Sequence, residues 1–137
     1  MKIVAVIAQK GGVGKTTAAI ELAVAAHLAG LAVGIIDLDP QATAAKWGDR
    51  RREREEDDSP SVIGGQASRL GLLLEAARTN GSDLILLDTP PHAEALALQA
   101  AKASDLILTP TRAGGFDLEA IQTTLEMPSL RRNPRMS

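Results

Sequence analysis

Eight residues near the N-terminus, K-G-G-V-G-K-T-T at positions 10–17, constrain the fold of this chain more than any other segment. They follow an apolar run at residues 3–8 and precede an alanine- and leucine-rich stretch with helical spacing. A buried strand, a glycine loop and a helix in that order form a phosphate-binding P-loop, whose backbone N–H groups point at an anion from a helix N-terminus. A plain glycine turn is the alternative. The P-loop is favoured because glycine, lysine and threonine all fall at the offsets that phosphate binding requires.

The residue types in this loop predict individual roles. Lys15 supplies a positive charge for the β- and γ-phosphates, and Thr16 places a hydroxyl to ligate Mg²⁺. Lys10 adds a second positive charge within the loop, and the two lysines repel each other unless several negative charges lie between them, as in a triphosphate. A solvated surface lysine is the alternative for Lys10. The predicted nucleotide-binding residues are Gly11, Gly12, Val13, Gly14, Lys15, Thr16 and Thr17.

Strand and helix patterns alternate along the chain, which predicts an α/β fold. The expected sheet is mostly parallel with helices on both faces, the three-layer arrangement of a P-loop NTPase. We expect one domain at residues 1–127, followed by a short basic tail at 128–137. The predicted strands are residues 2–8, 32–37, 61–63, 83–87 and 106–109. The predicted helices are residues 15–29, 42–47, 66–78, 93–103 and 117–127.

Carboxylates follow two of the predicted strands. Asp88 ends the apolar run at residues 84–87, while Asp37 ends the run at residues 32–37 and Asp39 follows two residues later. Ligands of open α/β sheets bind at the carboxyl ends of the strands, so we expect these acids near the P-loop. Because side chains two residues apart in a strand share a face, Asp37 and Asp39 can both reach the same site. Asp88 is the expected Mg²⁺ ligand opposite the Thr16 hydroxyl, and a helix cap is its alternative role.

Composition excludes several classes of function. The chain has no cysteine, which rules out a disulfide scaffold, a thiolate metal site and an iron–sulfur cluster. Its two aromatic residues, Trp47 and Phe116, are too few for a platform that stacks nucleic-acid bases. The net charge of −2 means that any DNA contact needs a local basic patch. The chain opens directly on a strand pattern and has no apolar run of membrane-spanning length, so we expect a cytoplasmic protein.

Two features outside these motifs are expected to be structural. The run of mixed charge at residues 49–58 is interpreted as a solvated helix end and loop. Trp47 is expected to anchor a helix against the sheet. His92 lies close to the predicted site in sequence, but we expect no catalytic role for it.

Three boxes together resemble the ParA/MinD family of partition and division-site ATPases. The loop at residues 10–17 is similar to the deviant Walker A box of that family, D-L-D-P-Q at 37–41 to its second acidic box, and D-T-P-P at 88–91 to its D-x-P-P box. The resemblance implies that ATP and Mg²⁺ are bound and that Lys10 reaches the nucleotide of a partner subunit, as an arginine finger does. It also implies that Asp39 activates the attacking water and that Asp37 supports the Mg²⁺ shell. The implied catalytic residues are Lys10, Lys15 and Asp39, and the implied metal residues are Thr16, Asp37 and Asp88.

The same resemblance implies a biological role. Members of this family segregate plasmids or chromosomes as ATP-dependent homodimers that bind non-specific DNA on the nucleoid and work with a ParB-like centromere-binding protein. The match runs to about residue 125, whereas the family continues with a further strand, an adenine-contacting segment and helices. We therefore expect a sheet that is incomplete at its C-terminal edge, in a truncated chain. The alternatives are a non-catalytic nucleotide-binding fragment and a MinD-like division-site regulator, although residues 129–137 lack the apolar face that membrane binding requires.

Overall fold

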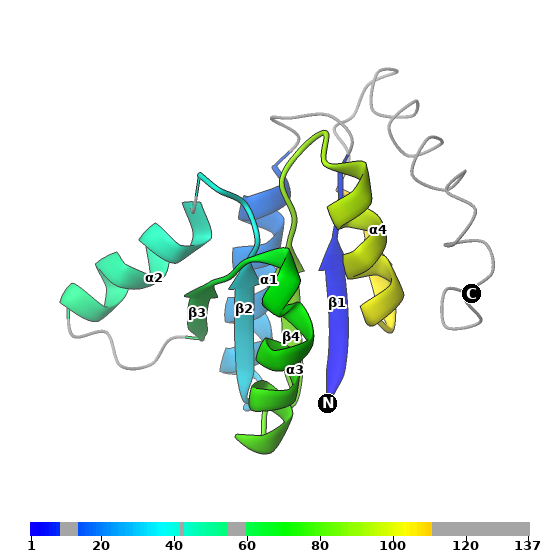
Figure 1. Ribbon diagram of the computed structural model, residues 1–137. Helices are drawn as coiled ribbons and strands as arrows, with labels where there is room; N and C mark the ends of the chain where they lie inside the picture. Colours follow the sequence, from blue (N-terminus) through cyan, green and yellow to red (C-terminus); the bar gives the residue numbers. More distant parts are fainter. Residues whose placement is uncertain (9–13, 42, 55–59, 111–137) are drawn as a thin grey trace.

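The computed structural model describes residues 1–8, 14–41, 43–54 and 60–110. They contain a five-stranded sheet with the strand order β3-β2-β4-β1-β5 (Figure 1). Every neighbouring pair of strands is parallel. The pattern of alternating strands and helices therefore produces the α/β fold that the sequence predicts. The strands are β1 (Lys2–Val6), β2 (Val33–Asp37), β3 (Ser61–Gly64), β4 (Leu84–Asp88) and β5 (Leu106–Leu108).

Helices cover both faces of the sheet (Figure 1). Side chains of β1, β2 and β4 alternate between the two faces, because successive residues of a strand point in opposite directions. On one face, Ile3, Ile36 and Ile85 pack with α3 and α4. On the other face, the neighbouring strand residues pack with α1 and α2. The helices are α1 (Lys15–Leu28), α2 (Thr43–Glu53), a short 3₁₀ helix η1 (Ala67–Arg69), α3 (Leu70–Thr79) and α4 (Glu94–Ala103).

Helix α2 extends past the helical pattern at residues 42–47. It ends at Glu53, inside the run at residues 49–58 that the sequence predicts to be a solvated helix end and loop. Two contacts between neighbouring turns support the added length. The Arg51 guanidinium lies 5.1 Å from the centre of the Trp47 ring, and Arg52 forms an ion pair with Asp49 one turn before it. Solvated charges are therefore compatible with helix here, because they pair along one side of it.

The remaining predicted elements differ from the structure mainly at their ends. Strand β1 ends two residues earlier than predicted, and the predicted helix at residues 66–78 divides into η1 and α3. The predicted helix at 117–127 and the tail at 128–137 lie outside the described residues. None of the helices in the described ranges is long and apolar enough to cross a lipid bilayer.

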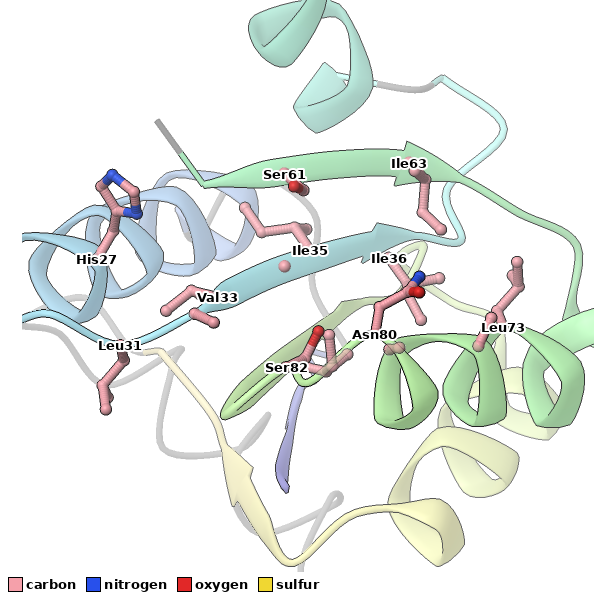
Figure 2. A pocket seen from close by; sticks show the side chains of 15 residues that line it. His27, Leu31, Val33, Ile35, Ile36, Ser61, Ile63, Leu73, Asn80 and Ser82 are labelled. Atoms are coloured by element: carbon pink, nitrogen blue, oxygen red, sulfur yellow. The ribbon is translucent and has the colours of Figure 1, made fainter. Parts of the chain in front are cut away.

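A cavity of about 500 Å³ lies between helix α3 and strands β2 and β3, toward the amino ends of these strands (Figure 2). Leu73 of α3 and Ile63 of the edge strand β3 border it, and 45% of Ile63 is exposed. Gly34 of β2 also lines the cavity, and a side chain added there would meet the end of the Ile85 side chain at 3.1 Å. The cavity is thus a gap in the packing between α3 and the sheet edge.

Candidate nucleotide-binding site

The site begins at the junction between β1 and α1. Gly14 precedes the helix with φ of 80° and ψ of 24°, a left-handed conformation that a residue without Cβ adopts at no steric cost. Lys15 is then the first residue of α1, where the unpaired N–H groups and the helix dipole favour an anion. Thr16 and Thr17 follow within the first turn. The predicted catalytic residue Lys10 and the predicted nucleotide-binding residues Gly11, Gly12 and Val13 lie outside the described residues.

Asp88 stands at the centre of this edge of the sheet. It ends β4 in register with Asp37 of β2 on one side and with Val6 of β1 on the other. The Asp88 side chain is fully buried, and each of its oxygens accepts a hydrogen bond from α1. Oδ1 forms an ion pair with Lys15 and accepts a hydrogen bond from its Nζ. Oδ2 accepts a hydrogen bond of 2.9 Å from Thr16 Oγ1. The fold therefore joins three residues that the sequence predicts for phosphate and metal binding.

The pKa of Asp88 is raised above the ordinary value for an aspartate. Burial is the largest cause, because a desolvated carboxylate is less stable in its charged form. The positive charge of Lys15 and the hydrogen bonds from Lys15 and Thr16 lower the pKa, while the negative charge of Asp37 raises it further. One lysine thus does not fully offset the burial of the carboxylate. An additional cation at this position would stabilise its charged form.

Asp37 is committed to the backbone that follows its own strand. Its side chain is buried, with Oδ1 accepting the backbone N–H of Asp39 at 3.1 Å and Oδ2 accepting that of Ala45 in α2 at 3.0 Å. These bonds fix the turn between β2 and α2. Asp39 is half-buried within that turn, and its Oδ1 accepts the N–H of Gln41 at 3.0 Å. Asp39 therefore lies two residues after Asp37, the last residue of β2, and Asp37 is in register with Asp88 of β4.

Sequence reasoning missed Thr89, the residue after Asp88. Its side chain is fully buried, and its hydroxyl donates a 2.9 Å hydrogen bond to the carbonyl of Val6 at the end of β1. This bond ties the strand that carries Asp88 to the strand that leads into the P-loop. The available signal was a polar residue directly after a buried strand, since buried hydroxyls need a partner. The turn beyond it includes His92, whose φ of 59° is uncommon for a residue other than glycine.

The donor set fits a hard cation such as Mg²⁺. Thr16, Asp37 and Asp88 offer oxygen atoms, which this ion prefers. No group of three His, Cys, Asp or Glu side chains in the described parts of the chain forms a metal cage by itself. Mg²⁺ typically binds through one or two carboxylates together with water and substrate phosphates. The arrangement therefore suits an ion that arrives with a nucleotide.

The parallel sheet, with Lys15 and Thr16 at the start of α1 beside Asp88 at the end of β4, defines the class of P-loop α/β folds. The sequence agrees, because residues 4–129 match the family described as the CobQ/CobB/MinD/ParA nucleotide binding domain. This chain therefore belongs to that family, as the three boxes predicted.

Two curated relatives are similar to most of this chain. The chromosome-partitioning ATPase Soj of Thermus thermophilus is 34% identical over 161 residues, covering 97% of this chain and 65% of Soj. Maintenance of carboxysome distribution protein A of Gloeobacter kilaueensis is 36% identical over 128 residues, covering 90% of this chain and 55% of that protein. This chain thus spans 55–65% of the length of these two relatives.

Solved structures show the same fold at lower sequence identity. The structure of pNOB8 ParA bound to nonspecific DNA aligns with a TM-score of 0.71 and 23% identity, over 92% of this chain and 58% of that one. Cobyrinic acid a,c-diamide synthase from Mycobacterium smegmatis, solved with bound ADP and magnesium, aligns with a TM-score of 0.72 and 21% identity, over 99% and 71% of the two chains.

Proposed function

We propose that this chain is the nucleotide-binding part of a Mg²⁺-dependent ATPase of the ParA type. The observation that carries the proposal is the junction at Asp88, where one buried carboxylate meets the P-loop residues Lys15 and Thr16. A cap role for Asp88 accounts less well for these contacts, because its oxygens bind side chains of α1. The reaction is hydrolysis of ATP to ADP and phosphate.

Each side chain of the site has a proposed part in this reaction. Thr16 and Asp88 would hold Mg²⁺, and Asp37 would support the shell of ligands around it. The ion would supply positive charge that neutralises the phosphates. Lys15 binds the β- and γ-phosphates, beside the backbone N–H groups of residues 11–17. Asp39 orients and activates the water that attacks. Lys10 acts across the interface of a homodimer on the nucleotide of the partner subunit.

The proposed biological role is segregation of a plasmid or chromosome. The similarity to a chromosome-partitioning ATPase supports this role, and the fold shared with a ParA solved on nonspecific DNA is compatible with it. In this proposal the protein forms ATP-dependent homodimers, binds non-specific DNA on the nucleoid in the cytoplasm and responds to a ParB-like centromere-binding protein. A nucleotide-binding chain without turnover is the second candidate, because the chain spans only part of its relatives.

Phosphate release by the purified chain tests the proposal. We expect release that requires both ATP and Mg²⁺, and loss of nucleotide affinity in Lys15→Ala. A charge-assisted contact contributes about 1.5–3 kcal/mol, so the affinity should fall roughly 10- to 150-fold. Lys2→Ala is the matched control, because Lys2 is an exposed lysine at the opposite end of β1. Unchanged binding in Lys15→Ala would overturn the P-loop assignment, and binding without turnover in the wild type would favour the second candidate.

A further inference from the structure

Asp88 holds two side chains that are proposed to bind different parts of a ligand. Lys15, which is proposed to bind phosphates, donates to Oδ1, and Thr16, which is proposed to bind the metal, donates to Oδ2. The two donors are consecutive residues of the first turn of α1. A single carboxylate thus restrains both the phosphate ligand and the metal ligand of the site.

Separating Lys15 from Asp88 is unfavourable unless another cation takes its place. Asp88 is fully buried and Lys15 is 8% exposed, so water screens this pair weakly. Removing one partner of a buried ion pair leaves an uncompensated charge, which is strongly destabilising. Asp37 offers no compensation, because it is a second acid in register with Asp88.

Nucleotides with and without a metal therefore meet this pair differently. A metal-free triphosphate brings only negative charge, and it must share Lys15 with a buried carboxylate. A triphosphate that carries Mg²⁺ brings a cation suited to the Asp88 and Thr16 oxygens. That cation can replace Lys15 beside Asp88, which leaves the Lys15 ammonium group for the phosphates.

We propose that Asp88 is a specificity-determining residue that makes the site select metal-loaded nucleotide over metal-free nucleotide, by restraining Lys15. This inference rests on the proposed function, because it takes the ligand to be a nucleoside triphosphate. It adds a role to the metal contact proposed for Asp88. The carboxylate rejects the incomplete ligand as well as binding the complete one.

Titration of the full chain with a fluorescent ATP analogue, in Mg²⁺ or in excess EDTA, tests the inference. We expect the wild type to bind the analogue about tenfold or more weakly in EDTA, the size expected for one charge-assisted contact. Asp88→Asn keeps the shape of the side chain and removes its charge. In EDTA this variant should bind about tenfold or more tightly than the wild type, although it loses affinity for the metal-loaded form.

If Asp88 only repelled the phosphates, removing its charge in Asp88→Asn would also raise the affinity for metal-free nucleotide. A double-mutant cycle separates the two causes, because only the proposed one acts through Lys15. In a Lys15→Ala background, Asp88→Asn should change the affinity in EDTA by less than about threefold. A gain as large as in the wild-type background would mean repulsion and would overturn the inference. Asp39→Asn gives the size of plain repulsion from another acid at this edge of the sheet.

The remaining outcomes also decide the matter. Wild-type protein that binds equally well in Mg²⁺ and EDTA overturns the inference while leaving the proposed function intact, and this comparison needs no variant. Wild-type protein that binds no nucleotide with Mg²⁺ overturns both. If Asp88→Asn does not fold by circular dichroism, Asp88→Ser provides a second uncharged variant for the same cycle.

Discussion

The carboxyl and amino ends of the central strands differ in how their side chains are held. At the carboxyl end, Asp37, Asp88 and Thr89 are buried, and each has defined hydrogen-bond partners. At the amino end, a cavity of about 500 Å³ remains between α3 and the edge of the sheet. Among the residues that the structure describes, those lining this cavity are mostly apolar and include no Asp, Glu, Lys or Arg (Figure 2).

This difference follows from the unequal cost of burying polar and apolar groups. A buried charge or hydroxyl without a partner is expensive, so the polar end of the sheet has one well-defined arrangement. Apolar groups lose only part of their contacts when a gap remains, so the other end tolerates imperfect packing. Substitutions at the carboxyl end should therefore change binding and turnover, whereas those at the cavity should change stability alone.

Lys10→Ala should show the largest effect on turnover. If Lys10 acts on the partner's nucleotide, its loss should lower turnover by about 10³–10⁵-fold, as for an arginine finger, while each chain still binds ATP. Wild-type turnover should rise more than linearly with protein concentration, since an active site needs two chains. Phosphate release and sedimentation with and without ATP measure these effects, with Lys102→Ala, an exposed lysine on α4, as the control. Efficient turnover by a wild-type monomer would show that no trans-acting lysine is needed.

Asp39→Ala should separate binding from hydrolysis at the same end of the sheet. Loss of a positioned general base typically lowers the rate by about 10²–10⁴-fold, whereas the bound triphosphate keeps its contacts with Lys15. We expect nearly unchanged affinity for a fluorescent ATP analogue and strongly reduced phosphate release. Normal hydrolysis in this variant would transfer the water-activating role to another acid, with Asp37 the next candidate.

The local features of the site were predictable from sequence. The glycine loop fixes Lys15 and Thr16 at the start of a helix, and an apolar run places Asp88 at a strand end, because each pattern spans only a few residues. The direct bonds between Asp88 and α1 join residues more than 70 positions apart. Sequence periodicity contains no information on such a pair, so the restraint on Lys15 became visible only in the structure.

The non-local parts of the fold were less predictable for the same reason. Alternating patterns indicate a parallel sheet but do not order its strands, and the cavity depends on how α3 lies against β2 and β3. The charged run was predicted to contain the end of a helix, but its composition did not show where. Pairs one turn apart support the helix up to Glu53. The capping bonds of Asp37 were also missed, since a strand-end acid looks the same whether it binds a cation or backbone N–H groups.

Thr89→Val should have a smaller effect, which lowers both the stability of the fold and, slightly, the affinity for nucleotide. The substitution keeps the shape of the side chain but removes the buried hydrogen bond to the Val6 carbonyl. We expect a loss of about 1–2 kcal/mol in the free energy of unfolding, measured by urea denaturation. Nucleotide affinity should fall slightly, because the bond ties β4 to the strand that leads into the P-loop. Thr89→Ser, which keeps the hydroxyl, is the control, and equal nucleotide affinity in both variants would show that this tie serves stability alone.

Gly34→Ala should show the smallest effect and the opposite sign. The added methyl enters the cavity and meets the flexible end of Ile85 at 3.1 Å, so the side chain can shift into free space. Restricting the unfolded chain and filling part of the gap should raise the free energy of unfolding by about 0.4–1 kcal/mol.

Gly48→Ala is the contrasting control, since its methyl would lie 2.8 Å from Cβ of Val62, in a contact without free space. That overpacking should cost about 1–3 kcal/mol, more than alanine gains over glycine in a helix. Urea denaturation of both variants, with nucleotide affinity measured alongside, tests the contrast. A change in affinity for Gly34→Ala would show that the cavity and the nucleotide site are coupled, and the comparison between the two ends of the sheet would fail.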